Sequence, residues 1–101
     1  MTYFKIDELV KQVKKDKSDL ALQALNNDFL KIQYFDHAVD WHTDSRDEFF
    51  ICLDGVANFE LKDQNYILHK GDMIIIESGK VHRADSVGSI LLSVEPHEKG
   101  R

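Results

Sequence analysis

The first segment of the chain carries apolar residues at a helical spacing. Four of them follow the pattern i, i+3, i+4, i+7, namely Ile6, Leu9, Val10 and Val13. Acidic residues stand near the start of this segment and lysines near its end, which complements the helix dipole. The pattern predicts an amphipathic helix within residues 1–18 that packs on the outside of a sheet.

From Leu20 onward the apolar runs shorten to the length of strands and are separated by turn residues. We expect strands at 20–25, 29–35, 48–54, 56–62, 66–69, 73–76, 81–85 and 89–95. Residues 37–40 are interpreted as a polar connection, and 96–101 as a polar, frayed tail. Short strands at close spacing favour a sandwich or barrel, so the prediction is one domain over residues 1–101, with an all-β barrel over 20–96.

Two of the predicted strands, 49–53 and 73–76, are apolar on both faces. An antiparallel sheet commonly turns one alternating, polar face to water, so a continuous apolar run requires a cover on each side. The predicted helix can cover only part of this surface. A second subunit packed sheet to sheet would cover the rest, and we therefore expect a homodimer.

Composition and charge exclude several classes of protein. The chain has 101 residues with a net charge of −5, which disfavours binding to nucleic acid. No apolar run reaches the roughly 20 residues of a membrane span, and the start lacks the apolar core of a signal peptide. A single cysteine, Cys52, allows no internal disulfide. We expect a cytoplasmic protein without a membrane partner, and Cys52 as a small buried hydrophobe.

Candidate metal ligands lie in two separate stretches. His42 and Asp44 are two residues apart, so on a strand they point to one face, and Glu48 follows at a further even offset. His82 comes after a predicted turn in the second stretch. Two imidazoles and one carboxylate with open positions suit iron, manganese, nickel or zinc. Asp44 is either a fourth ligand or an ordinary residue of a surface loop.

The spacing of these residues resembles the two motifs of small cupins. The first cupin motif has Gly, five residues, His, one residue, His, three or four residues, Glu, six residues and Gly, and it is matched here by His42, Glu48 and Gly55, with Asp36 at the first glycine and Asp44 at the second histidine. The second motif is matched by Gly71, Gly79 and His82, while Glu77 replaces a proline and Ser86 an asparagine. The sequence around both motifs is similar to that of small cupins that resemble mannose-6-phosphate isomerase.

This resemblance implies a jelly-roll barrel, a double-stranded β-helix, with a divalent metal ion held by His42, Asp44, Glu48 and His82. It also implies a small polar ligand or substrate and an isomerase-like or dioxygenase-like activity. Two alternatives stay open, a binding or sensing module without turnover and a metal-free scaffold. No general base is singled out, although Glu77, Tyr66 and Cys52 are candidates. Four aromatic residues either line the cavity or are simple core residues, which is the more frequent case, namely Trp41, Tyr34, Phe50 and Phe59.

Overall fold

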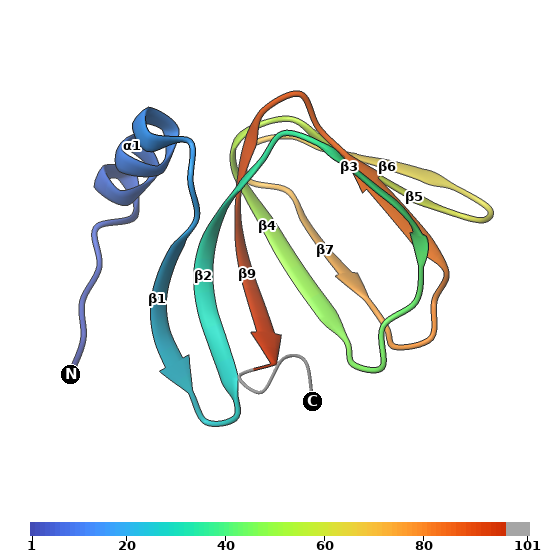
Figure 1. Ribbon diagram of the computed structural model, residues 1–101, viewed down its shortest axis with the longest axis horizontal. Coiled ribbons are helices and arrows are strands. Elements are labelled where there is room, and N and C mark those ends of the chain that lie inside the picture. Colours follow the sequence, from blue (N-terminus) through green and yellow to red (C-terminus); the bar gives the residue numbers. More distant parts are fainter. Residues whose placement is uncertain (97–101) are drawn as a thin grey trace.

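The computed structural model describes residues 1–96, which form one α-helix and nine strands (Figure 1). In chain order these elements are α1 (Ile6–Asp16), β1 (Leu20–Leu25), β2 (Asp28–Phe35), β3 (Ala38–His42), β4 (Glu48–Gly55), β5 (Ala57–Leu61), β6 (Asn65–Leu68), β7 (Met73–Ile76), β8 (His82–Asp85) and β9 (Ser89–Pro96). The expected frayed tail falls largely at 97–101, outside the described residues. No helix in the described part is long and apolar enough to cross a membrane.

The strands form two antiparallel sheets that face each other. The larger sheet has the order β1-β2-β9-β4-β7, and the smaller has the order β3-β8-β5-β6. β1 and β2, and β5 and β6, are consecutive neighbours, whereas the other neighbours come from distant parts of the chain, as where β2 pairs with β9 along its whole length. Figure 1 shows the two sheets opening from a shared upper end, with α1 beside the larger one. The expected mostly-β architecture with one short N-terminal helix is confirmed.

One expectation about the strands was wrong. Residues 37–40 were interpreted as a polar connection, but β3 already begins at Ala38 and pairs with β8 through Ala38 with Asp85 and Val39 with Ala84. Val39 packs against the buried core. A strand that buries few apolar side chains among charged neighbours gives a weak alternation signal, which explains the error.

The space between the sheets is filled by apolar side chains at one end only. The buried residues of this apolar cluster are Phe35, Cys52, Ala57, Phe59, Leu68, Ile76, Ala84 and Leu91. The rings of Phe50 and Phe59, from opposite sheets, approach to 5.1 Å between centroids. This cluster closes one end of the sandwich and holds the two sheets at a fixed separation, so the opposite end is left for polar residues.

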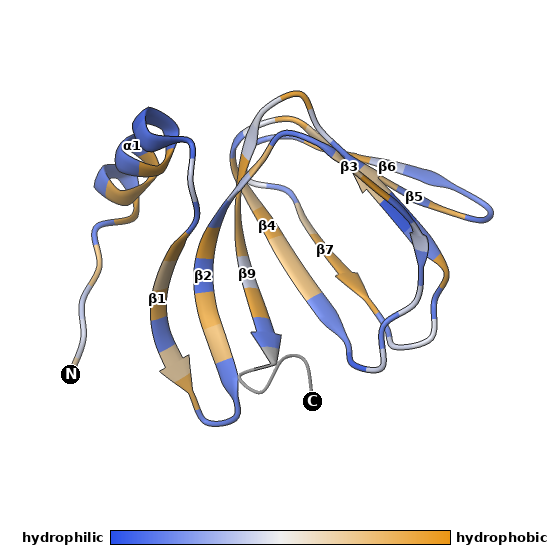
Figure 2. Ribbon diagram, viewed as in Figure 1, coloured by the Kyte–Doolittle hydropathy of each residue, from blue (hydrophilic) through white to orange (hydrophobic). Residues whose placement is uncertain are grey.

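A second apolar cluster lies on the outer face of the larger sheet, under α1. Val13 of the helix meets Ile32 of β2 and Ile90 of β9, and all three are almost completely buried. In Figure 2 the apolar, orange positions of α1 alternate with blue ones, as an amphipathic helix requires. Tyr34 packs against this outer cluster, so its expected place in the cavity wall was wrong. The helix therefore packs across β2 and β9 on the outer face of the larger sheet.

Gly55 ends β4 at a point where the chain has no room for a side chain. Its φ is +78°, and a Cβ there would lie 2.5 Å from the carbonyl oxygen of Gly88. Gly71 has a similar φ of +94°, but no atom lies within 4 Å of its Cβ position. A side chain at either position would strain the left-handed backbone, but only at Gly55 would it also clash with another residue. Comparing the two positions therefore distinguishes the free-energy cost of the strain from that of the clash.

We expect Gly55→Ala to destabilise the protein by about 2–4 kcal/mol and Gly71→Ala by only about 1 kcal/mol, because both strain φ but only the first also pushes backbone against backbone. Urea denaturation followed by circular dichroism measures both free energies of unfolding. Equal losses in the two variants would show that the close approach to Gly88 costs nothing.

Candidate metal centre

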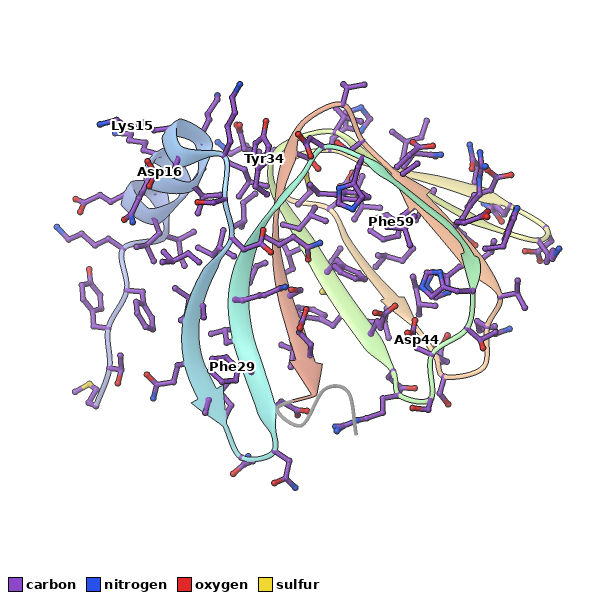
Figure 3. The ribbon with its side chains drawn as sticks, in the orientation of Figure 1. Lys15, Asp16, Phe29, Tyr34, Asp44 and Phe59 are labelled. Atoms are coloured by element: carbon purple, nitrogen blue, oxygen red, sulfur yellow. The ribbon has the colours of Figure 1, made fainter. Side chains whose placement is uncertain are left out.

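Four side chains with metal-binding atoms converge at the open end of the sandwich. They are His42, Asp44, Glu48 and His82, and one ligand atom from each can be chosen so that all lie within 4.8 Å of one another. The Nε2 atom of His82 lies 3.2 Å from Oε1 of Glu48 and 3.5 Å from Oδ2 of Asp44, and Nε2 of His42 lies 3.4 Å from the same Oδ2. Figure 3 shows Asp44 near the end of the sandwich remote from α1.

The strand register explains this convergence. His42 is the last residue of β3 and lies directly opposite His82, the first residue of β8, so their rings meet at a centroid distance of 4.3 Å. Glu48 begins β4 in the facing sheet and is paired with Ile76, a residue of the buried core. Residues from three strands and one loop are therefore fixed by backbone pairing rather than by contacts among themselves.

The loop that carries Asp44 is tied to the loop that precedes His82. The N–H of Gly79 donates to the backbone oxygen of Asp44 at 2.9 Å, and the N–H of Ser78 donates to Oδ1 of Asp47 at 2.9 Å. Asp44 is thus both a loop residue and a member of the cluster, although these two descriptions were first opposed as alternatives. Sequence reasoning missed the role of Asp47.

Both imidazoles are held in the tautomer that metal binding requires. Nδ1 of His42 lies 2.7 Å from the carbonyl oxygen of Asp40, and Nδ1 of His82 lies 2.8 Å from that of Lys80. A carbonyl oxygen can only accept, so in each neutral ring the proton is on Nδ1 and the Nε2 lone pair is free to bind an ion. His82 is 3% exposed and cannot reorient easily.

Among residues 1–96, no lysine or arginine forms an ion pair with Asp44 or Glu48, and their nearest basic groups are the two histidines. Oδ2 of Asp44 is buried and has no hydrogen-bond partner in that part of the chain. Burial and the neighbouring Asp44 carboxyl raise the pKa of Glu48 to about 7. A divalent cation at this point would satisfy the orphaned oxygen and remove the repulsion between the acids, so the residues present fit a metal ion. Two nitrogen and two oxygen donors suit iron, manganese, nickel or zinc.

The other candidate residues lie elsewhere. Cys52 faces the sandwich interior but is fully buried in the apolar cluster, as expected of a small hydrophobe. Trp41 is 38% exposed, with Lys62 and Arg83 over its ring, so its expected place in the cavity wall was wrong. Phe50 and Phe59 do lie between the sheets, as expected.

The remaining candidates give no support for a general base. Glu77 is exposed in the segment after β7, and Tyr66 is 38% exposed on β6, an edge strand of the smaller sheet. His37 and His69 lie outside the strands and are exposed, as expected, and His97 falls outside the described residues. Thus none of the three proposed bases is placed at the cluster by its contacts.

The chain belongs to the cupins. A family model described as a cupin domain matches residues 33–94, which include all four residues of the cluster. The expected resemblance is therefore confirmed, and the chain is a small cupin with a His, His, Asp and Glu cluster suggestive of a metal site.

Two curated proteins resemble parts of the chain. An acireductone dioxygenase from Physcomitrium patens is 33% identical over 92 residues, covering 79% of this chain and 44% of the dioxygenase. A mannose-1-phosphate guanylyltransferase from Sinorhizobium fredii is 34% identical over 55 residues, covering 54% of this chain and 11% of that enzyme. The chain spans less than half the length of both curated relatives.

Solved structures share the fold at low sequence identity. A cupin-2 domain protein from Shewanella frigidimarina has a TM-score of 0.79 at 22% identity, with 92% of this chain and 93% of that chain covered. A Ralstonia eutropha protein, provisionally named a mannose-6-phosphate isomerase, has a TM-score of 0.64 at 14% identity, with 78% and 84% covered. These likenesses establish the fold and say nothing of the reaction.

The pKa of Glu48 generates a prediction about pH. The pKa of Glu48 is about 7 in the folded protein and 4.5 ordinarily, so folding favours the protonated carboxyl. In the metal-free protein this preference stabilises the fold fully below pH 4.5, and the stabilisation is lost as the pH rises through 7. At pH 8 we expect Glu48→Gln to stabilise the metal-free protein by about 1–3 kcal/mol, a range that allows for the partial exposure of the carboxyl. Denaturation at pH 5 and pH 8 measures this difference.

Glu77→Gln is the control because Glu77 is exposed, and this variant should have the same free energy of unfolding as the wild type at pH 5 and at pH 8. Glu48→Gln should also reduce the gain in metal affinity between pH 6 and pH 8, because only the ionised carboxylate binds an ion. A Glu48→Gln protein less stable than the wild type at pH 8 would contradict the pKa assignment.

Proposed function

We propose that this cupin binds one divalent metal ion through His42, Asp44, Glu48 and His82 and acts on a small polar molecule that reaches the ion. The observation that carries the proposal is the pair of fixed tautomers, which aims two Nε2 lone pairs at two carboxylates with one orphaned oxygen. A metal-free scaffold has no need of this arrangement, since buried acids without a cation cost stability.

Solvent access supports binding of a second molecule at the centre. His42 and Asp44 have side chains that are 35% and 36% exposed, whereas His82 is buried behind them. An ion held there would be enclosed by protein on one side and open on the other. Four protein ligands leave further positions for a small molecule on iron or manganese, which commonly take six.

The charge of the ligand set favours oxidative chemistry as the activity. Asp44 and Glu48 together neutralise a divalent ion, which weakens its power to polarise a carbonyl oxygen but stabilises its higher oxidation state. When bound, iron would supply the oxygen chemistry, and the protein would supply the tautomers and the buried acids that hold it. Similarity to an acireductone dioxygenase points to the same class, so we favour a dioxygenase-like over an isomerase-like activity.

Elemental analysis of protein purified without an affinity metal tests the site. We expect close to one equivalent of metal in the wild type after reconstitution with Fe²⁺, Mn²⁺, Ni²⁺ or Zn²⁺, and at least a tenfold loss of affinity in His82→Ala, because a direct ligand is removed. His69→Ala is the matched control, since His69 is exposed and lies outside the cluster. Equal metal contents in all three proteins, or none in any, would refute the proposal.

We also propose that the cupin is a homodimer that packs through the outer face of the larger sheet. Beyond the area under α1 this face continues over β4 and β7, where Met73 and Ile75 are 56% and 52% exposed. Phe49 and Ile51 lie opposite them in the strand register and extend the same face. A second copy would present an identical apolar surface, which a two-fold axis can bury on both sides at once.

Ile75→Glu should convert the dimer into a monomer in sedimentation velocity, because it places a charge on the apolar face of the proposed interface. Ile67→Glu is the matched control, since Ile67 is similarly exposed at 54% but lies on β6 in the other sheet. A wild-type mass that stays monomeric at every concentration would exclude the dimer.

A further inference from the structure

The two faces of the larger sheet differ in polarity over part of β2 and β9. The outer face, under the helix, carries Ile32, Ile90 and Leu92, whereas the face turned into the sandwich carries polar side chains beyond the core residues Phe35 and Leu91. Phe35 and Leu91 fix which face is inner, because both belong to the core between the sheets. Side chains two and four residues away on the same strands share that face. They are Lys31, Gln33, Ser93 and Glu95, which we call the polar wall.

Members of the polar wall contact one another across the two strands. Nζ of Lys31 lies 3.0 Å from Oε2 of Glu95 and 3.5 Å from Oδ2 of Asp19, and Oγ of Ser93 donates to Oε1 of Gln33 at 3.5 Å. Ser93 is 2% exposed, and the side chains of Lys31 and Glu95 are 22% and 25% exposed, so the wall is largely buried but open to solvent in part. Burying these groups costs stability that an apolar wall would not cost, which calls for a functional reason.

The polar wall and the metal centre belong to one space. Glu95 is close enough to Glu48 to contribute to the raised pKa of that carboxyl, and Phe50 in β4 lies opposite Ser93. Val94, next to Glu95, is paired with Phe49, next to Glu48, so the two carboxyl-bearing residues stand side by side on neighbouring strands. A molecule that reached the ion would therefore have this wall at its side.

Charge decides which molecules the space can accept. Lys31 is already shared by two carboxylates, Asp19 and Glu95, and Arg46 pairs with Asp28 at 2.8 Å. One lysine facing two carboxylates leaves the wall with an excess of negative charge. A divalent ion would be neutralised by Asp44 and Glu48. An anionic ligand would thus meet a net negative wall, while hydroxyl groups could bond to the amide, the hydroxyl and the ion pair.

We propose that the polar wall is the recognition surface of this cupin and selects small, uncharged, hydroxyl-rich molecules over phosphorylated or carboxylated ones. The inference rests on the proposed function for the position of the ion, but the wall and its charges are properties of the chain itself. It names a substrate class that a likeness to phosphosugar enzymes would not suggest.

Titration of the ¹⁵N-labelled, Zn²⁺-loaded protein with two matched pairs of probes tests the proposal: D-mannose against D-mannose 6-phosphate, and D-mannitol against D-mannonate. We expect the neutral members to shift the amide signals of the wall residues and to bind at least tenfold more tightly than their anionic partners. An anionic partner that binds as tightly as its neutral member, or four probes that leave the wall signals unmoved, would overturn the proposal.

Two variants assign the selectivity to the wall. Gln33→Leu should weaken the neutral probes about three- to tenfold, the size of a lost hydrogen bond, while Gln64→Leu, in the turn between β5 and β6, should have no effect. Glu95→Gln removes one negative charge and frees Lys31 from one partner, so it should bring the anionic probes to within threefold of the neutral ones. Unchanged selectivity in both variants would also overturn the proposal.

The same titration of metal-free protein separates this inference from the proposed function. Without the ion the space is more negative still, so the preference for neutral probes at the wall signals should persist. A protein that binds no metal but keeps this preference refutes the metal centre and retains the wall. A protein that binds metal at the four-residue cluster but shows no preference refutes the wall alone.

Discussion

The pairing of His42 with His82 across β3 and β8 is the contact on which the rest of the site depends. It brings two imidazole rings to 4.3 Å between centroids, and each ring is then held by a hydrogen bond to a carbonyl oxygen two residues earlier in the chain. The facing sheet adds Glu48 and the intervening loop adds Asp44. A shift of one residue in this register would turn one histidine to the outer face and leave no cluster, because side chains alternate along a strand.

The space between the sheets has an apolar end and a polar end. The apolar end is filled by Phe35, Cys52 and Leu91, and the polar end contains the four-residue cluster and the polar wall. The apolar end fixes the distance between the sheets, so the polar end need not pack tightly to stay in place. This division lets orphaned and like-charged groups exist at the open end, since the stability they cost is supplied elsewhere.

Much of the fold could be predicted from the sequence because its signals are local. The stripe from Ile6 to Val13 predicted the helix, and short apolar runs between turn residues predicted all but one of the strands. β3 was missed because Val39 is its one apolar residue packed on the core, too little for an alternation pattern. Motif spacing brought the four cluster residues together, as the structure shows. The prediction that Trp41 and Tyr34 line the cavity was wrong. Either face of a strand can carry an aromatic residue, and only the partner sheet decides which face is inside.

The polar wall could not be predicted from one strand alone. Lys31 and Gln33 alternate with apolar residues as on any solvated strand, and only the position of α1 shows that the apolar side is the outer one.

The position of Asp44 has an evolutionary meaning. Asp44 stands in a loop and belongs to neither apolar cluster, so its exchange would alter the four-residue cluster at little cost to the packing of the fold. Descendants of one ancestral scaffold could thus acquire different reactivities by single substitutions at this position, each tested by selection on a protein that still folds.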